Sequence, residues 1–319
     1  MSERVAFIDM MSHSFVVFKR RPLNTLFFIA FYSCLMLAYN LWLSSSSGQG
    51  FLLGYAQSLN ALSAGKGAGS YFSYIALIYP VLFLFSVIYY AAAYRLLVRD
   101  NLKISLPVQL GLDEVRIFFA SLAVAAVMLC VMIALAIVMS LVTLALTLAL
   151  SPLMGDAQPP TVMMSLIILL IVIPVYAVLI YVMGRFGVSL PLSIKFRRLT
   201  LSGWSSSKGM GWSLFSAHLV MVIALVVLQF IVFMPLMMSS IELATVGANT
   251  DEAHMAQMVN IMSNPFGNFT YVLTPLMTLF TLIVLGPTSA IAARAIDPNA
   301  SNRHADPQCS SNTEPNPAE

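Results

Sequence analysis

The sequence predicts an all-α polytopic membrane protein with six transmembrane helices, and three observations support this prediction. The chain of 319 residues is 59% hydrophobic and only 9% charged, whereas a soluble domain is about 25% charged. Six apolar segments contain no Asp, Glu, Lys or Arg, and each is long enough to cross about 30 Å of hydrocarbon. Fifteen of the sixteen Lys and Arg residues lie in the terminal stretches and in alternate loops between these segments.

The six segments are expected to form one transmembrane domain over residues 1–296, followed by a polar tail over residues 297–319. Their bounds are Thr25–Leu43, Tyr71–Tyr94, Ile117–Leu150, Thr161–Gly184, Leu214–Met238 and Tyr271–Ala293. The tail is rich in Pro, Asn and Ser, a composition typical of disorder. A cleaved signal peptide is the alternative for the first segment, but its apolar stretch is longer than a typical signal core, which favours a retained span.

The third segment is longer than a bilayer requires. It runs for 34 residues without a charge, and at 1.5 Å per residue such a helix is about 51 Å long. We expect this helix either to tilt or to project beyond the hydrocarbon at its C-terminal end. It is not expected to form two spans. The loop before it is rich in basic residues and the loop after it is not, so the two loops are predicted to lie on opposite sides of the membrane, which requires an odd number of crossings.

The distribution of basic residues predicts the orientation, because short loops rich in Lys and Arg stay in the cytoplasm. Basic residues gather before the first segment, after the second, after the fourth and after the sixth, whereas the three opposite loops contain only Lys66. The sequence therefore predicts a protein of the bacterial cytoplasmic (inner) membrane with its N- and C-termini in the cytoplasm.

The chain reads as three helical hairpins, and its connectors indicate an internal duplication. The run Ile104–Pro107 follows the second segment, and the similar run Val188–Pro191 follows the fourth. Each comes after an arginine at the membrane edge, Arg95 or Arg185. Proline lacks a backbone N–H and biases the preceding residue toward extended geometry, so each helix is expected to end near these runs.

A short amphipathic helix is expected before the first segment. Four apolar residues recur there at helical spacing: Ile8, Met11, Phe15 and Phe18. The basic residues 19–21 follow them, a pattern typical of a helix that lies in the membrane interface. A helix packed on the other spans is the alternative. Similar stretches precede the other odd segments and predict interfacial helices there as well.

Each even segment contains a proline, and the last contains two: Pro80, Pro174, Pro275 and Pro287. A proline removes one backbone hydrogen bond and kinks the helix, which neighbouring helices tolerate within a membrane. A structural role for these kinks is favoured over a role as hinges of a gate.

The connector after the fourth segment carries the strongest candidates for contact with membrane lipids. Its candidate head-group contacts are Arg185, Arg197, Arg198, Trp204, Lys208 and Trp212. Tryptophan prefers the interface, because its apolar ring can contact hydrocarbon while its N–H contacts water. Each basic residue near an anionic surface adds about 1 kcal/mol of attraction. General anchoring at the interface is favoured over a specific lipid site.

The same connector resembles a recurring bacterial pattern. The run Arg185–Pro191, followed by Trp204, Lys208-Gly209 and Trp212–Phe215, is similar to the membrane domain attached to some bacterial glycerophosphodiester phosphodiesterases and to related stand-alone membrane proteins. The earlier connector from Arg95 to Arg116 resembles that family as well.

Three positions depart from the family pattern. Gly203 stands where the family usually has Ser, and Ser205 and Ser213 stand where basic residues are common. No phosphodiesterase catalytic domain is expected within these 319 residues. The resemblance therefore implies a membrane fold rather than an activity.

Few polar residues lie inside the apolar segments. His218 lies about one turn into the fifth and is a candidate intramembrane polar site; a neutral histidine hydrogen-bonded between helices is the favoured interpretation. Asn40 and Gln229 are interpreted as partners in hydrogen bonds between helices. In the loop before the sixth segment, His254 and nearby methionines would suit Cu(I), but an apolar helix face is the favoured interpretation there.

No catalytic, metal or nucleotide motif is found, so no catalytic residue, metal or cofactor is expected. The chain also lacks the dense basic face that nucleic-acid binding needs. We therefore expect a non-enzymatic scaffold or assembly component of the envelope, with membrane lipids as its partners. A transporter or channel for a lipid or other apolar solute is the alternative, since ion-coupled transport usually needs buried charge. An integral-membrane enzyme is the least favoured hypothesis.

Overall fold

The predicted all-α membrane fold is confirmed by the structure, a computed structural model. The structure describes residues 5–63, 65–66, 68–99, 111–154, 161–246 and 270–295. These residues form helices joined by short turns and contain no strand. Within them, six helical segments are long and apolar enough to cross a membrane. The predicted polar tail and the loop that contains His254 lie outside the described residues.

The predicted spans correspond to helices of the structure. In chain order the helices are α1 (Phe7–Arg20), α2 (Pro22–Ser44), α3 (Ser46–Ser63), α4 (Ala68–Val98), α5 (Leu112–Met154), α6 (Thr161–Gly187), α7 (Ser189–Lys195), α8 (Gly203–Ser206), α9 (Gly211–Val246), α11 (Thr270–Val284) and α12 (Gly286–Arg294). The first five predicted spans each lie within one helix, and the sixth is divided between α11 and α12.

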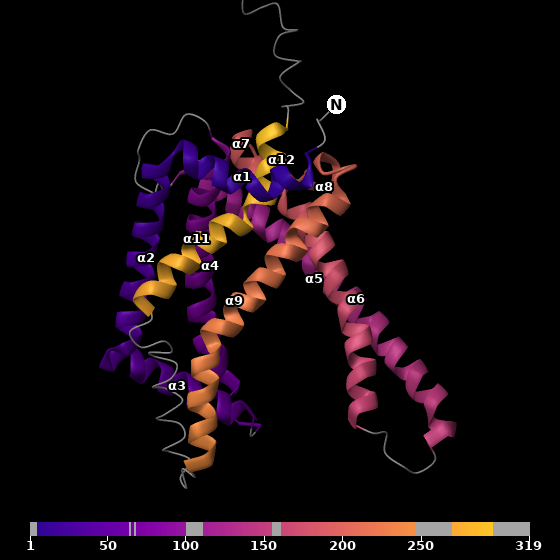
Figure 1. Ribbon diagram of the computed structural model, residues 1–319. Coiled ribbons are helices and arrows are strands. Elements are labelled where there is room, and N and C mark those ends of the chain that lie inside the picture. Colours follow the sequence, from indigo (N-terminus) through magenta and orange to yellow (C-terminus); the bar gives the residue numbers. More distant parts are fainter. Residues whose placement is uncertain are drawn as a thin grey trace, which may run out of the picture.

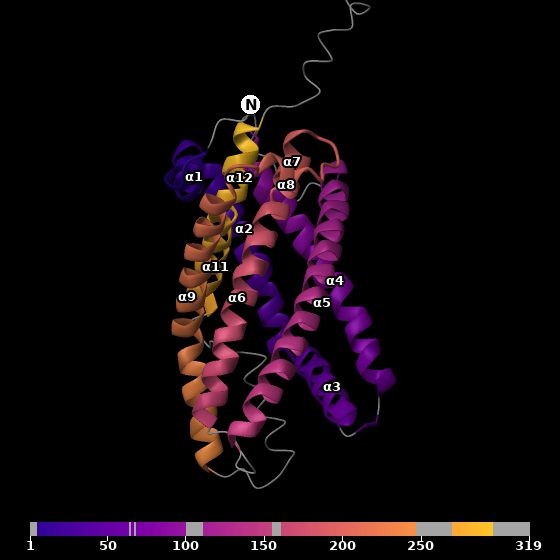
Figure 2. The ribbon, with the colours of Figure 1, turned by 90° about the vertical axis from the view of Figure 1, so that its right-hand side faces the viewer.

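The helices converge at one end of the molecule and diverge at the other. Helices α1, α7, α8 and α12 gather at the upper end in Figure 1, while the α5–α6 hairpin slants away from α9 below. Figure 2 shows the lower parts of α3 and α4 also lying apart from α9. The converging end carries the basic residues of the connectors, and we call it the basic end. Lys66 lies at the opposite end, between α3 and α4.

The largest group of buried apolar residues lies at the basic end. It joins α1, the end of α4, α7, the start of α9 and α12 through Met10, Leu97, Leu192, Leu214 and Ile291. Below this level many large apolar side chains on the spans are exposed, as expected of surfaces that face lipid. The tertiary packing of the described residues is therefore concentrated where the connectors meet.

Helix α1 has features of both structures expected for the N-terminal stretch, a helix in the membrane interface and a helix packed on the spans. Met10 and Ser14 are buried against α12 and α11, so one face of the helix packs on the spans. Ile8 is 74% exposed and Phe15 is 55% exposed. An exposed apolar face beside a packed one suits a helix that lies flat at the membrane surface.

Local sequence signals do not predict helix α3. The segment is rich in glycine and serine, which lowered its apparent helical tendency. Leu52 of α3 packs on Leu43 of α2, and the helix also contacts α4. Gly48 lets the turn between α2 and α3 close, because a Cβ there would lie 2.2 Å from the Trp42 carbonyl oxygen.

The chain bends within the sixth span, between α11 and α12 (Figure 1). Leu285 separates the two helices, and Pro287 occupies the first turn of α12, a position that tolerates its missing N–H. The Ser14 hydroxyl of α1 donates a hydrogen bond to the Leu282 carbonyl at 2.9 Å. Pro80, Pro174 and Pro275 lie inside helices α4, α6 and α11. A role of any of these prolines as a hinge stays a prediction.

The predicted break after the fourth span is confirmed, because α6 ends at Gly187 and α7 begins at Ser189. The matching run Ile104–Pro107 lies outside the described residues. The two junctions still share a feature: Arg95 contacts Glu114, and Arg185 contacts Trp204, each nineteen positions later in the chain. This likeness favours the duplication, which stays a prediction.

Candidate functional site

A buried ionic network joins the end of α4 to the start of α5. Arg95 Nη1 lies 2.7 Å from Glu114 Oε1, and these two side chains are only 7% and 8% exposed. Asp113 accepts from Arg99 at 2.8 Å and from Arg116 at 2.8 Å. The Gly111 N–H donates to Glu114 Oε2 at 2.8 Å, which satisfies one free donor at the helix start. Five charged side chains at the basic end therefore hold a helix junction together.

Two cations at the basic end, Lys195 and Arg99, bind the carbonyl oxygens at helix C-termini. Lys195 donates to the carbonyls of Ala293 and Ala295 at 2.6 and 2.7 Å, at the end of α12. Arg99 donates to the Ile194 carbonyl at 3.2 Å, at the end of α7. These carbonyls have no partner within their own helices and carry partial negative charge. The cations therefore stabilise the helix ends.

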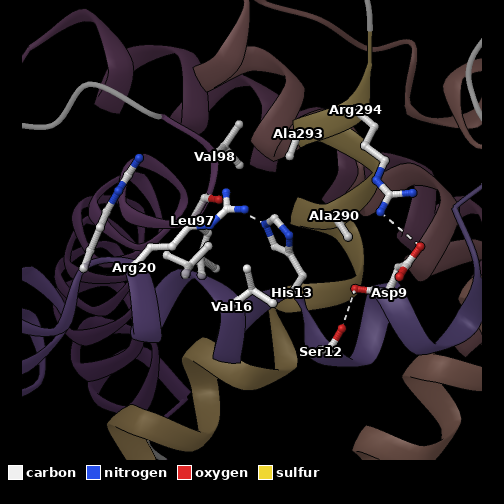
Figure 3. A pocket seen from close by; sticks show the side chains of 12 residues that line it. Asp9, Ser12, His13, Val16, Arg20, Leu97, Val98, Ala290, Ala293 and Arg294 are labelled. Atoms are coloured by element: carbon white, nitrogen blue, oxygen red, sulfur yellow. Dashed lines mark hydrogen bonds and ion pairs between the residues drawn. The ribbon is translucent and has the colours of Figure 1, made fainter.

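A cavity of about 330 Å³ lies between α1, α4 and α12 at the basic end (Figure 3). Arg294 Nη2 lies 3.0 Å from Asp9 Oδ2 across its edge. His13 Nε2 donates to the Leu97 carbonyl at 3.1 Å. The C-termini of all three helices meet here, and the positive charges of Arg20 and Arg294 oppose their negative dipole ends. The arrangement explains the basic lining without a bound anion.

Arg185 is held inside the protein rather than at its surface. Its guanidinium lies 3.8 Å from the centre of the Trp204 ring. It donates to the Ser207 hydroxyl at 3.1 Å, to the Tyr181 hydroxyl at 3.2 Å and to the Trp204 carbonyl at 2.7 Å. Arg185 therefore ties α6 to α8, and three of its N–H groups already have internal partners. A contact of Arg185 with a lipid head group stays a prediction.

The other candidate lipid contacts form an exposed surface around α7, α8 and the start of α9. Arg197 and Lys208 are exposed, as are four apolar residues: Leu199, Leu201, Trp204 and Trp212. Arg198 is half-buried, with its guanidinium 5.7 Å from the centre of the Phe196 ring. We call this the interfacial surface, because exposed tryptophan and leucine beside cations suit the boundary between head groups and hydrocarbon.

The close contact of α8 with α7 leaves no room for a side chain at Gly203. The Gly203 N–H donates to the Ser189 hydroxyl at 3.0 Å. A Cβ at this position would lie 2.7 Å from the Ser189 backbone nitrogen and 2.8 Å from the Arg185 carbonyl oxygen. Neither serine nor any other side chain fits there while the backbones keep this spacing.

Replacing Arg185 by lysine is expected to destabilise the protein by about 2 kcal/mol although the charge is kept. Lysine cannot lie flat on the Trp204 ring while donating to the three partners that Arg185 now has. The measurement is the melting temperature of the purified protein in detergent, read by size-exclusion chromatography after heating. Lys208→Met is the control, because Lys208 is exposed, and its melting temperature should match that of the wild type. An unchanged melting temperature for Arg185→Lys would contradict this role.

His218 packs against a neighbouring helix but hydrogen-bonds within its own. Its Nδ1 donates to the Leu214 carbonyl at 2.8 Å, one turn earlier in α9. Gly184 of α6 leaves room for the ring, since a Cβ there would lie 3.3 Å from His218 Nδ1. No group of three or more His, Cys, Asp or Glu side chains that would hold a metal occurs in the described part of the chain. His218 as a polar site stays a prediction.

A second cavity, of about 360 Å³, lies within the spans between α2, α4 and α11. We call it the intramembrane groove. It is lined by Tyr32, Met36, Asn40, Phe85, Ser86, Tyr89, Tyr90, Leu273, Thr274, Met277, Thr278 and Thr281. Tyr32 and Thr278 are buried at one end of the groove, while Met36 is 40% exposed. The interpretation of Asn40 as a partner in a hydrogen bond between helices is wrong for the described residues, because its amide bonds to none of them. The side chain of Gln229 lies outside the described residues.

An apolar cluster separates the groove from the cavity at the basic end. Tyr90 in the groove and Leu97 in the cavity are seven positions apart in α4, a rise of about 10 Å. The cluster fills this interval with Phe28, Ala93 and Leu282, all buried. We call it the apolar seal, because it closes the groove on the side of the basic end.

The groove was not found by sequence reasoning, although its residues leave a signal. Thr274, Thr278 and Thr281 recur at helical spacing in α11 and mark one hydroxyl-bearing face. Ser86 and Tyr89 do the same in α4. Each hydroxyl is unremarkable within a single span, and only the packing of three spans brings the faces together.

No protein-family model matches the chain, and no curated protein or solved structure matches it either. The resemblance to the membrane domain of glycerophosphodiester phosphodiesterases therefore stays a prediction. What the described residues show is a six-span helical membrane protein with a tightly tied basic end, an exposed interfacial surface and an uncharged groove within its spans.

Proposed function

We propose that this protein is a non-enzymatic scaffold or assembly component of the bacterial inner membrane, with both termini in the cytoplasm. The collection of connector cations at one end supports this orientation. Membrane lipids are its expected partners at the interfacial surface, where Lys208 and Trp212 are exposed. Nucleic acid is not expected, because the cations are dispersed among helix junctions.

The observation that carries this proposal is the exposed surface of α5. None of the side chains in an 18-residue apolar stretch of this helix is buried. Leu129, Ile133 and Ile137 lie on one face at four-residue spacing and are each more than half exposed. The same helix is fixed at its start by the Arg95–Glu114 pair. A helix anchored at one end, with an open side, suits contact with another membrane protein.

Photo-cross-linking tests this proposal. With a benzophenone amino acid at Ile133 or at Ile137 in the full chain, we expect one and the same protein adduct in intact cells, identified by mass spectrometry. Val226 of α9 is the control, because its exposure matches that of these two positions. Adducts with lipid alone at Ile133 and Ile137 would contradict the scaffold proposal.

The groove favours a transporter of a lipid or apolar solute as the second candidate. Its lining is uncharged, and the apolar seal closes it toward the basic end. A transporter that works by alternating access has one state that is closed on this side. Reconstituted vesicles distinguish the two candidates. A transporter moves a fluorescent lipid between leaflets, whereas a scaffold leaves its distribution unchanged.

A further inference from the structure

We propose that the intramembrane groove binds the uncharged polar end of a neutral lipid, of the chemistry found in a diacylglycerol. Such a head carries a hydroxyl group and ester carbonyls but no charge. This binding site is independent of whether the protein acts as a scaffold or as a transporter.

The lining of the groove selects against charge. None of the described side chains that line it is acidic, basic or a histidine. An ion buried in the spans without a partner of opposite charge would cost several kcal/mol. The phosphate of a common phospholipid is therefore a poor occupant, whereas a neutral head loses much less hydration on entering.

The groove nevertheless offers one amide group without a partner among the described residues. The side-chain amide of Asn40 forms no hydrogen bond with any described residue, although it lies in the α2 span. An unpaired amide in apolar surroundings is costly, so most such groups have a partner. The Asn40 amide can donate to an ester carbonyl of the ligand and accept from its hydroxyl.

The hydroxyl groups in the groove complement this amide. Ser86 donates to the Leu82 carbonyl at 2.7 Å, and Thr278 donates to the Thr274 carbonyl at 3.0 Å. Their protons are engaged within their own helices, but each oxygen keeps lone pairs that can accept from a ligand hydroxyl. These hydroxyl oxygens can accept a hydrogen bond from the ligand hydroxyl, and the Asn40 amide can donate one to a ligand carbonyl. The two kinds of group together match a head that has both a hydroxyl and carbonyls.

The shape of the groove gives the ligand a direction. Its volume of about 360 Å³ is within the range of sites for small molecules. The buried end lies beside Tyr32 and Thr278, and the exposed end lies at Met36. The hydroxyl end of the head would point toward the apolar seal, and its ester carbonyls would lie nearer Asn40, one turn beyond Met36 in α2. The acyl chains would leave at this exposed end. Met36 and Met277 are flexible and can adapt to chains of different shape.

Photoaffinity labelling with two lipids tests the proposal. The full chain is reconstituted in nanodiscs with a diazirine-bearing diacylglycerol, or with a phosphatidylglycerol that has the same diazirine-bearing chain. We expect the diacylglycerol to label peptides of α2, α4 and α11 at the groove, and the phosphatidylglycerol to label them at least about fivefold less. Equal labelling of these peptides by the two lipids would overturn the assignment.

Two variants and a control locate the label. Ser86→Phe fills the groove and should reduce labelling by the diacylglycerol at least about fivefold. Ser140→Phe is the control, because Ser140 is an exposed serine of α5 that makes the same type of hydrogen bond, to the Ala136 carbonyl; its labelling should be unchanged. Asn40→Leu should lower labelling about fivefold through the loss of one hydrogen bond, without lowering the melting temperature.

The second variant keeps the test decisive if Ser86→Phe fails to fold. Asn40→Leu removes only an amide that has no described protein partner, so the protein should fold as before. Labelling that is unchanged in Asn40→Leu would overturn the role of the amide. Labelling that is unchanged in a folded Ser86→Phe would overturn the site itself.

Discussion

Arg95→Met is expected to lower the free energy of unfolding by about 3–5 kcal/mol, the largest effect of any single substitution considered for this chain. Arg95 and Glu114 lie 2.7 Å apart and are almost fully buried, so the variant leaves the Glu114 carboxylate without its closest cation. The junction between α4 and α5 should loosen. Size-exclusion chromatography after heating in detergent measures the loss of folded protein. Thiol-reactive dyes are unsuitable, because Cys34 and Cys130 are exposed before unfolding.

Two comparisons separate this effect from a general loss of charge. Arg116→Met removes a cation from the same network, but Arg116 is 21% exposed and Asp113 keeps Arg99 as a partner, so the loss should be much smaller. The double variant Arg95→Met with Glu114→Met should be more stable than Arg95→Met alone, because no buried charge is left unpaired. Equal melting temperatures of Arg95→Met and wild type would contradict the role of the pair.

Gly203→Ala is expected to destabilise the protein by about 3 kcal/mol, at the upper end of the cost of overpacking. The added Cβ would lie 2.5 Å from the Ser189 hydroxyl and 2.8 Å from the Arg185 carbonyl oxygen. Backbone atoms cannot move aside as a flexible side chain can. Helix α8 must therefore shift from α7, which also disturbs the contact between Arg185 and Trp204. The melting temperature should fall, and tryptophan fluorescence should change at temperatures below unfolding.

Gly69→Ala is the matched control for Gly203→Ala. Gly69 lies in helix α4, and a Cβ there would meet no atom within 4 Å. Alanine is the better helix former, so this variant should be as stable as the wild type or slightly more stable. If both variants melt at the wild-type temperature, the close approach of α7 and α8 does not hold in the folded protein.

Much of the fold follows from local composition. Each predicted span is contained in the helices of the structure, because a run of about 20 apolar residues has to form its backbone hydrogen bonds internally in lipid. Helix α6 ends at Gly187, beside the predicted run, although Leu190 and Pro191 lie within helix α7 and not in extended backbone. Helix α3 was missed, since its many glycines and serines give a weak local signal and contacts with α2 and α4 stabilise it.

The candidate sites were less accessible to sequence reasoning. Arg185 and Lys208 have similar positions beside the membrane, and the sequence assigns both to lipid head groups. In the structure Lys208 is exposed, whereas Arg185 lies over the Trp204 ring. Which cation is exposed and which ties helices depends on the path of the chain between α7 and α9, and composition does not encode that path.

The sequence by itself determined that the chain is helical, that it has six spans and that its connector cations share one side, because hydropathy and charge act locally along the chain. Only the tertiary structure decided that Arg95 pairs with Glu114, that Gly203 admits no side chain, and that hydroxyl-bearing faces of α2, α4 and α11 enclose a groove. These features depend on distances between residues far apart in sequence, and such distances are fixed only when the helices pack.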